Sequence, residues 1–119
     1  MSTVQTENIK GLTGGLPQNL KPVTASAWVH FDGTTLSIAD SHNVSSITDK
    51  GVGDYGLNYL VNLQNANYSV VSNPGTLANR GLNSRNRTVS GVDAIAFITN
   101  TGVFIDVTEA NVLVFGGNS

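Results

Sequence analysis

The sequence predicts an all-β protein, an antiparallel β-sandwich or jelly-roll-like domain preceded by an extended N-terminal arm. About eight short segments have strand-like patterns of apolar residues, and turn residues separate them at near-regular spacing. No segment has a convincing helical period. Gly, Asn, Ser and Thr make up 50 of the 119 residues, which suits a fold with many tight turns and polar strand faces.

Residues 1–23 are expected to form the arm, and residues 24–119 the sandwich domain. The arm is rich in glycine and proline, and its apolar residues follow no sustained period. Because the arm has no strand partner of its own, we expect a neighbouring chain to hold it; the competing interpretation is an N-terminus without fixed structure. Its candidate partner-binding residues are Val4, Ile9, Leu12, Leu16 and Leu20.

The first predicted strands follow the arm. From Thr24 onward, apolar residues at 27, 29 and 31 alternate with polar or aromatic neighbours, as in a half-buried strand. Asp32-Gly33 predicts a turn, and residues 35–39 are expected to return as the second strand of a hairpin. Residues 44–48 form a third candidate, with a bulge because Val44 and Ile47 fall out of phase.

The clearest alternation runs from Tyr55 to Leu63. A helix through this segment is the competing interpretation, but its asparagines and aromatic residues favour a strand. A turn at residues 65–67 leads into another strand at residues 68–72. The side chains of the central strand that are expected to share the core face are Tyr55, Leu57, Tyr59, Val61 and Leu63.

Residues 76–91 are predicted to form a polar loop. It contains three of the six cationic residues of the chain, Arg80, Arg85 and Arg87. The loop is either simply solvated or docks on a partner, because planar guanidinium groups suit paired contacts with carboxylates. Three final strands are expected at residues 94–99, 103–108 and 112–115, with a hairpin turn at residues 100–102.

Composition and charge exclude several classes of protein. No apolar run approaches the roughly 18 residues of a membrane span, and the first residues lack the pattern of a secretory signal. A net charge of −2 and a pI near 5.4 argue against nucleic-acid binding. The absence of cysteine excludes disulfides, thiolate nucleophiles and cysteine-ligated zinc. We therefore expect neither a membrane nor a nucleic acid as partner.

The sequence contains few candidates for chemistry. His30 and His42 would form a metal site only if the fold brought them together. Residues 49–54 place two carboxylates around two glycines, which fits either a hairpin turn or an incomplete calcium site. Motifs of hydrolases, zinc proteases and nucleotide-binding loops are missing. We expect no catalytic residue, no metal and no cofactor.

A set of short motifs resembles a module that recurs in virion proteins of tailed bacteriophages. They are AWVHFDGT at residues 27–34, NVSSITD at 43–49, GVGDY at 51–55 and NANY at 65–68, in the order and at the spacing of that module. The first residues are also similar to the starts of phage tail-fibre and appendage proteins. The resemblance covers about residues 1–72. Within it, His30 and Asp32 replace the usual asparagines, and Tyr59 stands where phenylalanine is common.

The resemblance implies a β-rich virion component, often trimeric, with no catalytic residues. Because the chain is short and begins with Met, we expect a small head decoration, cement or head-fibre protein, attached through its arm to capsid or tail proteins. The alternative is a tail-fibre or adhesin-type module that recognises host surface glycans, with Trp28 or Tyr68 stacking on sugar rings. A polysaccharide depolymerase is the remote third interpretation, because Asp93, Asp106 and Glu109 form no recognisable acid–base pair in the sequence.

Overall fold

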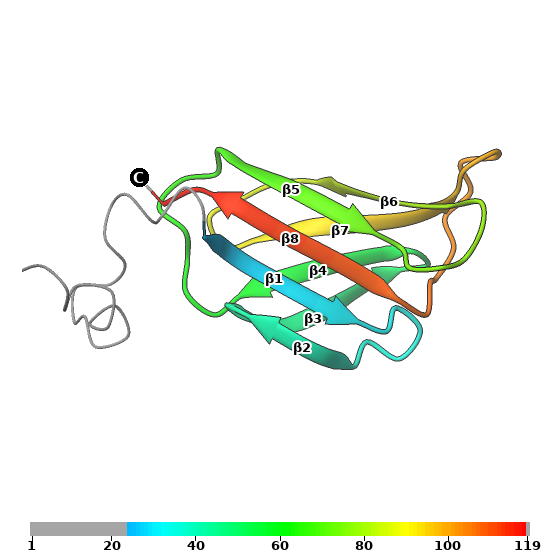
Figure 1. Cartoon of the computed structure of the whole chain (residues 1–119), viewed down its shortest axis with the longest axis horizontal. Coiled ribbons are helices and arrows are strands. Elements are labelled where there is room, and N and C mark those ends of the chain that lie inside the picture. Colours follow the sequence, from blue (N-terminus) through cyan, green and yellow to red (C-terminus); the bar gives the residue numbers. More distant parts are fainter. Residues whose placement is uncertain (1–23, 119) are drawn as a thin grey trace, which may run out of the picture.

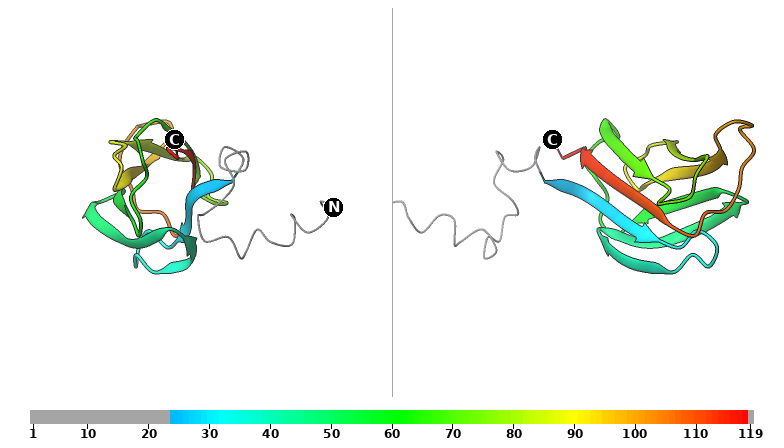
Figure 2. Two further views of the ribbon diagram at one scale, coloured as in Figure 1. Left: turned by 90° about the vertical axis from the view of Figure 1, so that its left-hand side faces the viewer. Right: turned by 45° about the vertical axis from the view of Figure 1, so that its right-hand side comes forward.

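The computed structural model describes residues 24–118 and forms two antiparallel sheets of four strands each, packed face to face (Figures 1 and 2). The predicted all-β sandwich is confirmed. The predicted arm, with Val4, Ile9, Leu12, Leu16 and Leu20, lies outside the described residues. Among the described residues, no helix is long and apolar enough to cross a membrane.

Sheet A has the strand order β2-β1-β8-β5 and faces the viewer in Figure 1, whereas sheet B has the order β3-β4-β7-β6 and lies behind it. The pairs β1–β2, β3–β4 and β6–β7 are hairpins within one sheet, and the other connections cross between sheets. The strands are β1 Ala25–Phe31, β2 Ile38–His42, β3 Val44–Gly51, β4 Asp54–Tyr59, β5 Tyr68–Asn73, β6 Arg80–Arg85, β7 Gly91–Ile98 and β8 Ala110–Gly116.

The core lies between the two sheets, where alternate residues of each strand point inward. Two edge-to-face aromatic pairs join the sheets across it. The ring centroids of Phe31 and Tyr55 are 5.3 Å apart, and those of Tyr59 and Tyr68 are 6.0 Å apart. Such pairs stabilise a core beyond the area that they bury. The prediction that Tyr55 and Tyr59 belong to the core is confirmed.

The hydroxyl of Tyr55 fastens the long β7–β8 connection to the core. It donates to Asp106 Oδ1 at 3.2 Å and accepts the N–H of Val107 at 3.2 Å. The same carboxylate oxygen accepts the N–H of Gly53 at 2.8 Å. Burial raises the pKa of Tyr55 to about 12, so the folded chain holds this proton tightly.

The predicted strand from Tyr55 to Leu63 is too long, because β4 ends at Tyr59. Leu60 donates its N–H to the carbonyl of Asn43 instead of continuing the ladder. Val61 is exposed, contrary to the prediction, while Leu63 is buried as expected. A contact from a distant turn therefore overrides the local alternation.

Two predictions in the second half are wrong. Residues 80–85 form the edge strand β6 rather than part of a loop, because β7 pairs with them along their whole length. Residues 103–108 form no strand and contribute only one bridge, between Phe104 and Phe97. The fastening of Asp106 and Val107 by Tyr55 explains why this segment leaves the sheet.

The remaining strand predictions differ from the structure by a few residues at most. β2 begins at Ile38 rather than at residue 35, because Leu36 adopts a left-handed conformation within the turn. The bulge predicted in the third strand is confirmed by a register shift between Val44 and Ser46. The 32–33 turn joins β1 and β2 as an antiparallel hairpin, as expected.

Candidate functional site

A row of apolar side chains crosses the outer face of sheet A. Trp28 on β1 lies opposite Leu113 on β8, and Leu113 lies opposite Val71 on β5. Trp28 is half-buried, whereas Leu113 is 38% exposed and Val71 is 57% exposed. Directly opposed residues on adjacent strands have Cβ atoms roughly 5 Å apart. Trp28, Leu113 and Val71, here called the apolar row, therefore form a continuous strip across the sheet.

The sequence of β8 explains how the row arises. Val112 and Val114 point inward and are fully buried, which leaves Leu113 and Phe115 on the outer face. A strand that is apolar on both faces is typical of a sheet covered on both sides. Grouped apolar side chains on an otherwise polar surface mark interaction sites. The middle of β8 therefore presents apolar side chains on both faces of sheet A.

A polar row lies beside the apolar row on the same face. His30 is opposite Asn111, and Asn111 is opposite Asn73. His30 Nε2 lies 3.4 Å from Glu109 Oε2. His42 is opposite Trp28, so the two histidines belong to different rows of side chains. Within residues 24–118, no group of three or more potential ligands is placed to hold a metal ion.

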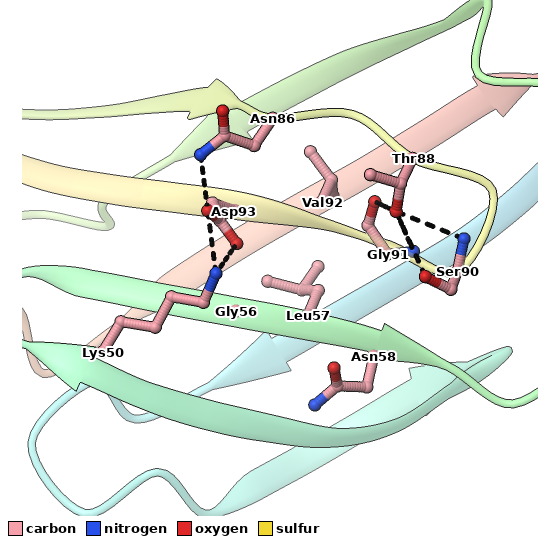
Figure 3. Close-up of a pocket in the computed structure, with 10 residues that line it drawn as sticks. All are labelled: Lys50, Gly56, Leu57, Asn58, Asn86, Thr88, Ser90, Gly91, Val92 and Asp93. Atoms are coloured by element: carbon pink, nitrogen blue, oxygen red, sulfur yellow. Dashed lines mark hydrogen bonds and ion pairs between the residues drawn. The ribbon is translucent and has the colours of Figure 1, made fainter.

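The outer face of sheet B carries instead a polar hollow of about 380 Å³. Asp93, which is only 6% exposed, is one of the residues that line it. Lys50 Nζ pairs with Asp93 Oδ1 at 2.9 Å, and Asn86 Nδ2 donates to Oδ2 at 2.9 Å. Figure 3 shows Lys50 and Asn86 reaching Asp93 from two different elements. The hollow is lined by Lys50, Gly56, Leu57, Asn58, Asn86, Thr88, Ser90, Gly91, Val92 and Asp93.

Two glycines line the hollow. Gly56 lies opposite Asp93, and a Cβ there would lie 3.0 Å from Cε of Lys50. The lysine side chain therefore reaches Asp93 by passing over Gly56. A Cβ on Gly91 would overlap the carbonyl oxygen of Leu57 in the paired strand. Both glycines thus have a packing role that needs no ligand.

The polar groups of the hollow are engaged with one another. The Thr88 hydroxyl donates to the carbonyl of Gly91 at 3.0 Å and lies 3.2 Å from the hydroxyl of Ser90. Neither hydroxyl is paired with a general base, which nucleophilic catalysis by serine or threonine requires. This arrangement can form hydrogen bonds with a polar molecule but provides no activated nucleophile.

The structure does not bring the three predicted arginines into one surface. Arg80 and Arg85 lie at opposite ends of β6 and on opposite faces of it. Arg85 Nη2 pairs with Asp54 Oδ2 at 3.0 Å, and its guanidinium lies 5.7 Å from the ring centroid of Phe104. Arg80 Nη1 donates to the carbonyl of Asn79 at 3.3 Å. Arg87 is exposed beyond the strand.

The segment with two carboxylates, residues 49–54, is a hairpin turn between β3 and β4, as one of the two interpretations predicts. Asp49 Oδ1 accepts the N–H of Gly51 at 3.0 Å, whereas Asp54 pairs with Arg85. The two carboxylates therefore have separate partners within the chain. Gly53 has a φ of +64°, a conformation that favours glycine in such a turn.

Comparisons of the chain with protein-family models, with curated proteins and with solved structures found no match.

Proposed function

We propose that this chain is a non-enzymatic structural component of a bacteriophage virion, of the head decoration, cement or head-fibre type. In this proposal the outer face of sheet A packs against another copy of the chain in a homo-oligomer, and the N-terminal arm attaches the assembly to the particle. The observation that carries the proposal is the apolar row. The motif resemblance supplies the virion context and favours a trimer.

The apolar row has the properties of an interface core. Tryptophan is enriched among the residues that dominate binding energy, and charged residues are depleted at the centres of interfaces. The row itself contains no charged side chain, and only 12% of the chain is charged. Covering Leu113 and Val71 would remove exposed apolar surface from water, which is favourable.

The first test is the oligomeric state of the purified full chain, measured by light scattering after size-exclusion chromatography. Leu113→Glu places a charge in the middle of the row and is expected to yield monomers. Asn83→Glu, on the exposed outer face of sheet B, is the matched control and should leave the oligomer intact. A wild-type monomer, or an oligomer that survives Leu113→Glu, would overturn this docking face.

The second test concerns the particle. A decoration protein binds the assembled shell and stabilises it by mass action. Particles without this chain are therefore expected to release DNA at a lower temperature, and added wild-type protein should restore the higher temperature. Added Leu113→Glu protein should not. Particle stability that is independent of the chain would contradict a decoration role.

A glycan-binding module is the second candidate, and the position of Trp28 favours it. The indole lies on an outer sheet face next to His30 and Asn111, so an aromatic platform and hydrogen-bonding groups are adjacent. Tyr68, the other predicted stacking residue, is buried, and its hydroxyl lies 2.8 Å from the carbonyl of Thr88. Binding to a host-glycan array that Trp28→Ala abolishes would favour this role over docking between copies.

A further inference from the structure

The connection from β4 to β5 presents the two most exposed large apolar side chains of the described residues. Leu60 is 72% exposed and its neighbour Val61 is 65% exposed. They lie where β4 leaves sheet B, at the end of the sandwich where β1 begins and β8 ends (Figure 1). Leu60 and Val61, here called the apolar step, do not belong to the apolar row, which lies on the outer face of sheet A.

The apolar step is held in a fixed conformation by one side chain. The amide of Asn43 accepts the N–H of Val61 at 2.8 Å and donates to its carbonyl at 3.1 Å. The same amide nitrogen donates to the carbonyl of Ser26 at 3.2 Å. Asn43 itself has a φ of +55°, which asparagine tolerates better than most residues. A surface that is ordered before binding loses less entropy when it is covered.

A hollow of about 390 Å³ lies beside the apolar step. Leu60, Val61 and Leu63 line it together with Ser26 and Asn118, and Asn118 Nδ2 donates to Ser26 Oγ at 2.8 Å. Residues near both ends of the described chain thus meet at this hollow. Ser26 therefore lies beside an apolar surface that nothing in residues 24–118 covers, and it is only two residues from Thr24, where the described chain begins.

We propose that the apolar side chains of residues 16–20 of the same chain, Leu16 and Leu20, cover the apolar step and fill the hollow. Leu20 is four residues before Thr24, which corresponds to a reach of about 13 Å in an extended chain. The short tether gives this segment a high effective concentration at the hollow. This contact uses only the last part of the arm, which leaves Val4, Ile9 and Leu12 for the attachment to the particle in the proposed function. The contact itself lies within one chain and does not require the virion role.

The chain contains no cysteine, so an engineered pair gives an unambiguous cross-link. The full chain with Leu20→Cys and Val61→Cys should form an intramolecular disulfide on mild oxidation, seen as faster migration on a non-reducing gel and as the loss of two hydrogens in the intact mass. The matched control, Leu20→Cys with Asn83→Cys on the exposed outer face of sheet B, should remain reduced. A disulfide only between copies, none at all, or equal cross-linking in the control would overturn the proposal.

A thermodynamic cycle in the full chain tests the same contact without cysteine. Leu20→Ser and Leu60→Ser should each lower the melting temperature, and the double variant should lower it by less than the sum of the two, because both substitutions remove one contact. Strict additivity would contradict the proposal. A failure of Leu113→Glu to change the oligomeric state would overturn the docking face and leave this contact unaffected.

Discussion

The two outer faces of the sandwich are built from similar strands but differ in chemistry. In sheet A, β8 turns Leu113 outward between Trp28 and Val71. In sheet B, the corresponding inner strand β7 turns Asp93 outward, next to Gly56. A partner that covers the outer face of sheet A would remove apolar side chains from water. On the outer face of sheet B, the carboxylate of Asp93 is already paired with Lys50 and Asn86 of the same chain. The fold alone therefore does not define an interaction surface; the outward residues of its inner strands do.

The largest expected loss of stability comes from a substitution at Gly91, which lines the polar hollow of sheet B. Gly91→Ala would force a Cβ into the carbonyl oxygen of Leu57, and overpacking against backbone costs about 3 kcal/mol. In Gly56→Ala the tightest contact of the new Cβ is with the flexible end of Lys50, at 3.0 Å, and the lower chain entropy of alanine in the unfolded state offsets part of its cost. Urea unfolding of the two variants measures the difference. If the two variants lost the same free energy of unfolding, Gly91 would have no special role in packing against Leu57.

The next effect concerns the interior that both faces share. Tyr55→Phe removes the hydroxyl that forms hydrogen bonds with Asp106 and Val107. Because buried groups then lack a partner, the free energy of unfolding should fall by about 1–3 kcal/mol. Tyr59→Phe is the matched control. The buried Tyr59 hydroxyl has no hydrogen-bond partner within the described residues, so its removal should be neutral or stabilising at neutral pH.

The pH dependence of stability follows from the same tyrosine. Burial raises the pKa of Tyr55 to about 12, whereas an unfolded tyrosine titrates near about 10. The folded state binds the proton more tightly, so its stabilisation is complete below pH about 10 and is lost as the pH rises through about 12. Urea midpoints measured across this interval should fall, and they should fall less steeply in Tyr55→Phe. If the urea midpoint of Tyr55→Phe fell with pH as steeply as that of the wild type, the pH dependence could not come from Tyr55.

A smaller effect tests the ion pair on sheet B. Lys50→Met leaves the buried carboxylate of Asp93 with Asn86 as its remaining side-chain partner. Because the lysine side chain is 45% exposed, solvent weakens the ion pair, and we expect its loss to lower the free energy of unfolding by about 1 kcal/mol. Arg87→Met, on an exposed side chain, is the control and should cost less. Chemical denaturation at low and high salt measures both.

The smallest effect on folding is expected at the apolar row. Leu113→Thr and Val71→Thr keep residues that suit strands on an exposed face, so the free energy of unfolding should change by no more than about 0.5 kcal/mol. Association of the chain should weaken nevertheless. A large loss of stability in dilute monomer would show that the row serves folding rather than docking, and would remove the contrast between the two faces.

The strands that could be predicted from sequence are those whose alternation is clear. β1 and β4 bury alternate apolar residues, and Tyr55 lies in the core as expected. β6 has no clear pattern in the sequence, because Leu82 is its only buried apolar residue. Residues 103–108 have a strand-like pattern, yet Tyr55 holds Asp106 away from the ladder. These errors arise where a distant partner, rather than local pattern, determines the backbone.

The candidate surfaces were less predictable than the strands. The apolar row joins Trp28, Leu113 and Val71, which are far apart in the chain and meet only because β8 inserts between β1 and β5. The sequence does contain one indication of the apolar row. Residues 112–115 of β8 are all apolar, and alternate side chains of a strand point to opposite faces, so some of them have to point outward. The arginines, which looked like a cluster in the sequence, are separated by the alternation of β6.

The sequence by itself determined the all-β class and most of the turns, because alternation and turn chemistry act over a few neighbouring residues. Only the tertiary structure decided which outward residues share a face, where β4 ends and how Lys50 reaches Asp93 across Gly56. Those features depend on the order and register of strands that are distant in the chain. Pairing of this kind is set by the packing of the whole sandwich, which no local pattern encodes.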